Sequence, residues 1–164
     1  STLMRSSAAS DVYKRQMDTP MSQGTRCRQL AEYVVFESPL NMLCDSPTNY
    51  DREEECTEFI ATIPTVWEQT IAMNGEIGKY ITMARRKGDV WYVGSLTNWD
   101  ARTLTLDLSF LGAGRWKAEM FHDGVNANRL ASDYQKTVTD IPASRKLTVK
   151  MAQGGGCALK IYKE

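Results

Sequence analysis

Six glutamates between residues 37 and 68 are the side chains with which this chain could cleave a covalent bond. Hydrolysis of a glycosidic bond, for example, needs two carboxyl groups, one protonated and one ionised, flanking the bond. Glu37 directly precedes an expected helix kink at Pro39, and the acidic run is typical of a solvated helix start. The six candidates are Glu37, Glu53, Glu54, Glu55, Glu58 and Glu68.

Glu68 differs from the others because it follows Trp67 at the end of an expected strand, residues 63–67. If that strand belongs to a β/α barrel, its carboxyl end faces the catalytic mouth. An aromatic ring can cover the apolar face of a sugar, and a carboxylate can accept hydrogen bonds from its hydroxyls. We therefore predict Trp67 and Glu68 as substrate-binding residues. The alternative is that Trp67 packs in the junction between the barrel and the following domain.

Three other motifs have structural interpretations. His122-Asp123 ends a strand at a turn and has no nucleophile in matching context, and Arg85-Arg86-Lys87 is interpreted as a solvated hairpin end. The three consecutive glycines at 154–156 follow no strand-to-helix arrangement, so they are interpreted as a flexible connection and not as a phosphate loop.

The cysteines form no C-x-x-C pair and lie apart from the single histidine, which argues against zinc, and we expect no metal site in this chain. Cys27 and Cys157 occupy apolar phases and are expected to be buried free thiols. A disulfide between Cys44 and Cys56 stays open, since spacing cannot decide it.

Helical periodicity dominates the first part of the chain. Residues 22–44 predict a helix whose apolar face repeats at three and four residues, with Ser22 or Thr25 as its cap. Pro39 should kink it or start a second short helix, and residues 45–49 are a predicted loop. A short helix is expected within 51–61. The apolar face of the first helix, at 22–44, consists of Cys27, Leu30, Ala31, Val34 and Val35.

From about residue 76 the period changes to two, which indicates strands with one buried face. The alternation is clearest at 103–108, 115–120 and 146–151, and Lys87-Gly88-Asp89 is a predicted hairpin turn between 77–86 and 90–97. No helix-length crossover follows, so the expected fold is an antiparallel β-sandwich.

Composition bounds the remaining possibilities. Of 164 residues, 42% are hydrophobic and 20 basic residues balance 20 acidic ones, so nothing favours nucleic acid or an anionic membrane, and no apolar run suits a membrane span. Residues 1–16 resemble translated sequencing-adapter read-through, with a genuine disordered tail as the alternative. The expected fold class is an α+β fragment. It consists of a leader at 1–16, helices and a strand at 17–75, and an antiparallel β-sandwich at 76–164.

Ordered strings over about residues 17–164 resemble glycoside hydrolase family 97, the α-glucosidase and α-galactosidase group of gut Bacteroidetes. The family pattern has an Asp-Glu pair after the tryptophan of the fourth string, whereas this chain has Glu68-Gln69, which weakens the proposed role of Glu68. The strings are GTR at 24–26 with QLA at 29–31, YVVFESPLNMLCDSPTNY at 33–50, ECTEFI at 55–60, IPTVWEQT at 63–70 and ARRKGDVWYVG at 84–94.

The resemblance implies a fold and a function for a longer parent protein. Residues 17–75 would be the last helices and strand of a (β/α)8 barrel, and residues 76–164 an appended β-sandwich. The parent would be a calcium-dependent exo-acting α-glycosidase of the periplasm or cell envelope, with α-linked oligosaccharides as substrates. Its catalytic and calcium-binding glutamates would lie upstream of Gly24. The chain itself would then be inactive, with no catalytic residue and no calcium of its own.

A non-enzymatic role is the alternative for the chain itself. It would be a β-module for domain packing, homo-oligomerisation or carbohydrate binding, the last through Trp91, Trp99 or Trp116. A carbohydrate-binding face needs two or more exposed aromatic rings in line. Trp116 shares the apolar phase of its strand and is expected in the core, whereas the other two are undecided. The parent's specificity and stereochemical outcome also stay open.

Overall fold

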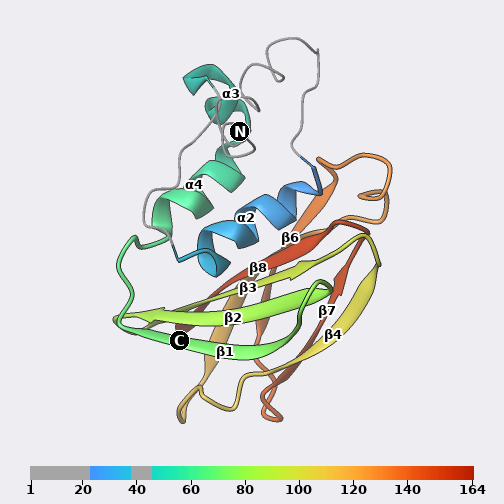
Figure 1. Cartoon of the computed structure of the whole chain (residues 1–164). Helices are drawn as coiled ribbons and strands as arrows, with labels where there is room; N and C mark the ends of the chain where they lie inside the picture. The colour runs from blue at the N-terminus through green and yellow to red at the C-terminus, as the bar shows by residue number, and fades with distance from the viewer. Residues whose placement is uncertain (1–22, 38–45) are drawn as a thin grey trace.

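The computed structural model describes residues 23–37 and 46–164, and these form a helical layer over a β-sandwich (Figure 1). The helices precede all the strands in the chain. In order, the elements are α2 (Arg26–Val35), α3 (Pro47–Arg52), α4 (Glu54–Thr62), β1 (Gln69–Glu76), β2 (Tyr80–Lys87), β3 (Val90–Thr97), β4 (Arg102–Asp107), β5 (Trp116–Asp123), β6 (Tyr134–Asp140), β7 (Lys146–Met151) and β8 (Gly156–Lys163).

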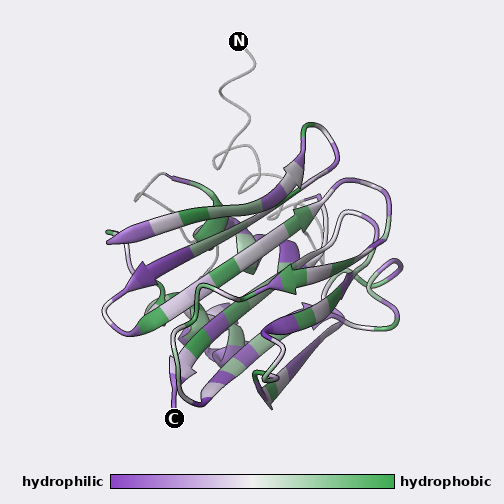
Figure 2. Ribbon diagram, turned by 90° about the horizontal axis from the view of Figure 1, so that it is seen from below, coloured by the Kyte–Doolittle hydropathy of each residue, from purple (hydrophilic) through white to green (hydrophobic). Residues whose placement is uncertain are grey.

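The strands form two antiparallel sheets, as the period-two alternation predicts. A six-stranded sheet has the order β1-β2-β3-β8-β5-β6, and β4 pairs with β7 in a separate two-stranded sheet. Lys87 pairs with Val90, so Gly88-Asp89 forms the expected hairpin turn, with Gly88 in the left-handed region at φ 57°. Hydrophobic and hydrophilic residues alternate along several strands (Figure 2).

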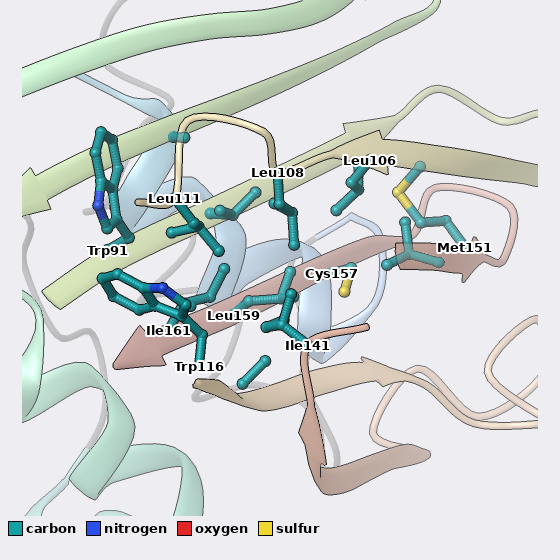
Figure 3. Close-up of a cluster of buried hydrophobic side chains, with 14 residues drawn as sticks. Trp91, Leu106, Leu108, Leu111, Trp116, Ile141, Met151, Cys157, Leu159 and Ile161 are labelled. Atoms are coloured by element: carbon teal, nitrogen blue, oxygen red, sulfur yellow. The ribbon is translucent and has the colours of Figure 1, made fainter. Parts of the chain in front are cut away.

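The larger core lies between the two sheets (Figure 3). Leu106 and Val149 from the small sheet meet Val93, Leu159 and Ile161 from the large one, all with 1% or less of their surface exposed. The ring of Trp91 lies 4.5 Å from that of Phe110, and the Trp116 indole donates to the Gly112 carbonyl at 2.9 Å. This face of the large sheet is therefore closed by the β4–β7 pair.

The second core lies on the opposite face of the large sheet, where α2 covers β3 and β8. The predicted apolar face of α2 is buried in full, with exposures from 0% to 7%, because it packs on Leu96, Phe121 and Ala158. Phe59 of α4 joins this cluster, with its ring centroid 4.8 Å from that of Phe121. The centre of the large sheet, at β3 and β8, is thus buried on both faces.

The strand expected at residues 63–67 is wrong. Helix α4 continues to Thr62, and Ile63 is its C-cap, donating its N–H to the Ile60 carbonyl. The first hydrogen bond to the sheet comes from the Glu68 N–H to the Arg86 carbonyl, and β1 begins one residue later. The β-branched residues therefore form an irregular connection. Strand β1 pairs with β2, so the sheet begins before residue 76.

Some other expectations change at the chain's helical end. The predicted loop at 45–49 gives way to α3, which starts at Pro47 because proline suits the first helical position. Thr25 is confirmed as the cap of α2. Ser22, Cys44, the kink at Pro39 and residues 1–16 lie outside the described residues. No helix in the described ranges is both long and apolar enough to cross a bilayer.

Candidate functional site

The first turn of α2 is attached to the sheet through a chain of backbone hydrogen bonds. The Thr25 hydroxyl accepts from the Arg28 N–H at 3.2 Å, which caps the helix. The Thr25 N–H donates to the Gly154 carbonyl, and the Gly154 N–H donates to the Asn98 carbonyl. The Arg28 guanidinium also donates to the Thr97 carbonyl at 2.7 Å. The start of α2 is therefore fixed to the two turns at one end of the β3–β8 pair, where β3 ends and β8 begins.

The three glycines at 154–156 are buried, so their interpretation as a flexible connection is wrong. A Cβ on Gly156 would lie 2.5 Å from the Arg28 Cα, and one on Gly155 would lie 2.0 Å from Asp123 Oδ2. Glycine is needed here because the turn passes against helix backbone on one side and a carboxylate on the other. Close packing explains this run, and the sequence alone did not reveal it.

The side chain of Asp123 fixes the same turn by accepting hydrogen bonds from its backbone. Its Oδ2 accepts from the Ala152 N–H at 2.8 Å and from the Gly156 N–H at 3.2 Å. Burial raises the pKa of Asp123, and these hydrogen bonds, together with one from Thr25, oppose that rise. Neighbouring His122 contacts the Asp123 carbonyl through Nδ1 at 3.2 Å. These contacts confirm a structural role for the pair.

The last turn of α2 is held by Arg85, which was expected to be solvated. Its side chain is only 3% exposed, and it donates to the carbonyls of Val35 at 3.1 Å and Phe36 at 3.2 Å. A cation at a helix C-terminus satisfies free carbonyls and complements the helix dipole. Burial lowers the pKa of Arg85. Arg85 shares its strand face with Ile81 and Met83, a phase that places it towards α2.

Trp67 lies at this same end of α2. Its ring is 5.5 Å from that of Tyr92 in an edge arrangement, and the Arg85 guanidinium lies 5.7 Å from its centroid. The Tyr92 hydroxyl donates to the Thr62 carbonyl at 2.6 Å, which anchors the end of α4. These contacts place Trp67 in a packed junction between the helices and the sheet, as its structural alternative predicts. Contact between Trp67 and sugar stays a prediction.

Glu68 contacts the β2–β3 turn instead of facing a second carboxylate. Its Oε2 accepts from the Gly88 N–H at 3.1 Å, and its Oε1 lies 3.4 Å from Lys87 Nζ. The hydrogen bond from Gly88, and to a smaller extent the contact with Lys87, lowers the pKa of Glu68. The carboxylate is also exposed to solvent. Such a carboxylate can accept hydrogen bonds but cannot act as a general acid near neutral pH. Its role in binding substrate also stays a prediction.

Two of the other acidic candidates, Glu53 and Glu55, are engaged in surface contacts. Glu53 forms an ion pair with Arg26, with Nη2 and Oε1 3.1 Å apart, and Glu55 accepts from the Tyr134 hydroxyl at 3.0 Å. In the described ranges, no group of three or more His, Cys, Asp or Glu side chains could hold a metal ion. These residues therefore do not fit the calcium site implied for the parent.

The described cysteines are buried, whereas the tryptophans divide between core and surface. Cys27 and Cys157 are confirmed as buried free thiols, and Cys56 is a third. Trp91 and Trp116 are 6% and 8% exposed, so neither can bind a ligand at the surface, whereas Trp99 is 63% exposed. The three rings considered for carbohydrate binding therefore do not form an exposed row.

Comparison with known proteins decides the family. The family model described as "Glycosyl-hydrolase 97 C-terminal, oligomerisation" matches residues 66–162. The chain belongs to glycoside hydrolase family 97. Over 158 residues it is 56% identical to a retaining alpha-galactosidase of Bacteroides thetaiotaomicron, covering 96% of this chain and 24% of that protein.

Solved structures agree with this family 97 assignment. A family 97 enzyme from Pseudoalteromonas sp. strain K8, in complex with acarbose, matches 90% of this chain with a TM-score of 0.82 and 38% identity. A beta-arabinopyranosidase matches 87% of the chain with a TM-score of 0.73 and 26% identity. The chain covers 24% and 22% of those proteins, so it corresponds to about a quarter of each.

Proposed function

We propose that this chain is the C-terminal quarter of a retaining α-galactosidase that acts as an exo-glycosidase on α-linked oligosaccharides. The observation that carries the proposal is the 56% identity to the Bacteroides thetaiotaomicron enzyme over 96% of this chain. Retaining hydrolysis needs two carboxyl groups about 5–5.5 Å apart, one of them protonated. Glu53, Glu55 and Glu68 are engaged in other contacts, which supports placing the reacting pair in the upstream part of the parent.

In this proposal the helical part of the chain, up to residue 68, completes the catalytic barrel, and the β-sandwich, which begins with β1 at Gln69, supports it from outside. The two attachments of α2, at Thr25 and at Arg85, support this assignment because they fix one helix rigidly against the sheet. The parent would also hold calcium through upstream glutamates and reside in the periplasm or cell envelope. The chain itself would contribute no catalytic residue.

The test compares the parent with this chain. The reading frame is extended upstream, and both proteins are assayed with the 4-nitrophenyl α-glycosides of galactose and glucose. We expect the parent to prefer the galactoside and to release the α-anomer first, as proton NMR of the early product would show. We expect this chain to be inactive. Hydrolysis by this chain that is lost in Glu68→Gln, or inversion by the parent, would contradict the proposal.

A non-catalytic role in self-association is the second candidate for the β-sandwich. It is favoured by the oligomerisation description of the family model, whose match covers every strand of both sheets.

A further inference from the structure

An open groove of about 670 Å³ lies between the β1–β2 hairpin and the first turn of α2. Its walls are residues 72–81 of the hairpin, residues 96–98 and Arg28. Two isoleucines on this hairpin are exposed, Ile77 completely and Ile81 to 39%. Hairpin tips normally carry small polar residues, and Ile77 packs against no core in this chain. Single exposed apolar residues are common, but these two isoleucines adjoin a groove that is also lined by Ala72, Met73 and Leu96. A contiguous apolar surface of this kind suits contact with another molecule.

The adjoining edge of the sheet carries few charges and is protected mainly by a bulge in β1. Strand β1 is the terminal strand of the large sheet, and its sequence QTIAMNGE contains a single charge, Glu76. Natural edge strands usually carry lysine, proline or other charges that prevent pairing with another chain. The opposite edge, β6, follows that rule with Lys136 and Asp140. A bulge between Ala72 and Asn74 interrupts β1 but leaves its apolar character intact.

The charges at the hairpin tip suit a copy of the same surface. Glu76 and Lys79 form an ion pair across the turn, so the tip carries one charge of each sign. A twofold axis between two such tips would place each carboxylate beside the partner copy's ammonium group, as an isologous contact requires. A strongly acidic or basic partner would gain nothing from this neutral tip.

We infer that a second copy of this chain binds at the β1–β2 hairpin, with Ile77 of each copy seated in the groove of the other. This inference rests on the proposed self-association of the β-sandwich and names its surface. The isoleucine supplies apolar contact, and the reciprocal Glu76–Lys79 pairs set the orientation.

The experiment is sedimentation equilibrium of the full 164-residue chain over a range of concentrations. The variant is Ile77→Asp, and the matched control is Val125→Asp, because Val125 is 87% exposed on a loop away from the groove. We expect a dimer for the wild type and the control, and on the order of a tenfold weaker dimer for Ile77→Asp, as for a central interface residue. Thermal melting by circular dichroism verifies that each variant is folded.

A second pair of variants tests the orientation. Glu76→Lys with Lys79→Glu reverses both charges, so this double variant should dimerise with itself but mix poorly with the wild type. A monomeric wild type, an unchanged Ile77→Asp dimer or equal weakening in the control would overturn the inference. Protection of residues 72–81 from amide exchange in the parent but not in this chain would assign the groove to the upstream barrel instead. Activity of the parent is measured separately, so failure here leaves the proposed hydrolase intact.

Discussion

Substituting Gly156 by alanine tests whether close backbone contact attaches α2 to the sheet. The added Cβ would lie 2.5 Å from the Arg28 Cα and 2.9 Å from the Ser95 carbonyl oxygen. Carbon atoms approach comfortably to about 3.5 Å, so the helix must move by about 1 Å relative to β8. All of the nearby atoms belong to backbone, and no side-chain rotation can relieve the contact.

Overpacking of this kind costs about 2–3 kcal/mol of unfolding free energy, at the upper end of the usual range. For a domain of this size the melting temperature should fall by about 4–12 °C. The measurement is urea unfolding followed by tryptophan fluorescence and far-UV circular dichroism. Gly112→Ala is the matched control, because a Cβ there meets nothing within 4 Å and its φ is not positive. If Gly156→Ala unfolds within 0.5 kcal/mol of the wild type, roughly the level of a neutral surface change, the proposed contact does not hold α2.

Four further predictions use the same unfolding assay or a simple modification. Arg85→Ala should cost about 2–3 kcal/mol, because it leaves two helix carbonyls without a charged donor, and Arg85→Lys should cost less; equal stability of all three proteins would contradict this. Asp123→Ala should cost about 2–4 kcal/mol by removing the acceptor of two N–H groups. Because burial raises the pKa of Asp123, the folded state binds the proton more tightly, so the stability of the wild type relative to Asp123→Asn should fall as the pH rises above 3.8. A constant difference across the acid range would exclude that pKa shift. Burial also raises the pKa of the Cys27 and Cys157 thiols, so iodoacetamide should modify them only after unfolding, as peptide mass mapping would show.

Much of the fold could be predicted because burial leaves a regular pattern in the sequence. Leucines alternating with threonines at 103–108 locate β4, and the three-and-four spacing of Leu30, Val34 and their neighbours locates the buried face of α2. Strand β6 was not recognised, because an edge strand that is only half-buried on both faces has no clear alternation. The β-branched residues at 63–67 suit a strand but have no neighbouring strand with which to pair.

The sequence did not reveal the two places where α2 is attached to the sheet, Arg85 and the glycines at 154–156, for a different reason. Arg85 resembles a surface charge in the sequence, and only its alignment with Ile81 and Met83 indicates that it faces the helix. The three glycines at 154–156 are typical of a flexible linker, yet at Gly156 the turn approaches the backbone of α2 closely. The role of the glycines depends on which segments meet in space, and single-chain periodicity does not contain that information, whereas the strand phase of Arg85 does give a signal.

The burial of the sheet on its helical face has a practical consequence for anyone dividing the parent into pieces. The family match begins at residue 66, after α2 and α4 have ended. A polypeptide of residues 66–164 would expose Phe121 and Ala158, both 0% exposed here, together with Leu96. Sequence-family limits therefore cut through this folding unit, and the shorter piece should be prone to precipitate unless α2 is retained with the strands it covers.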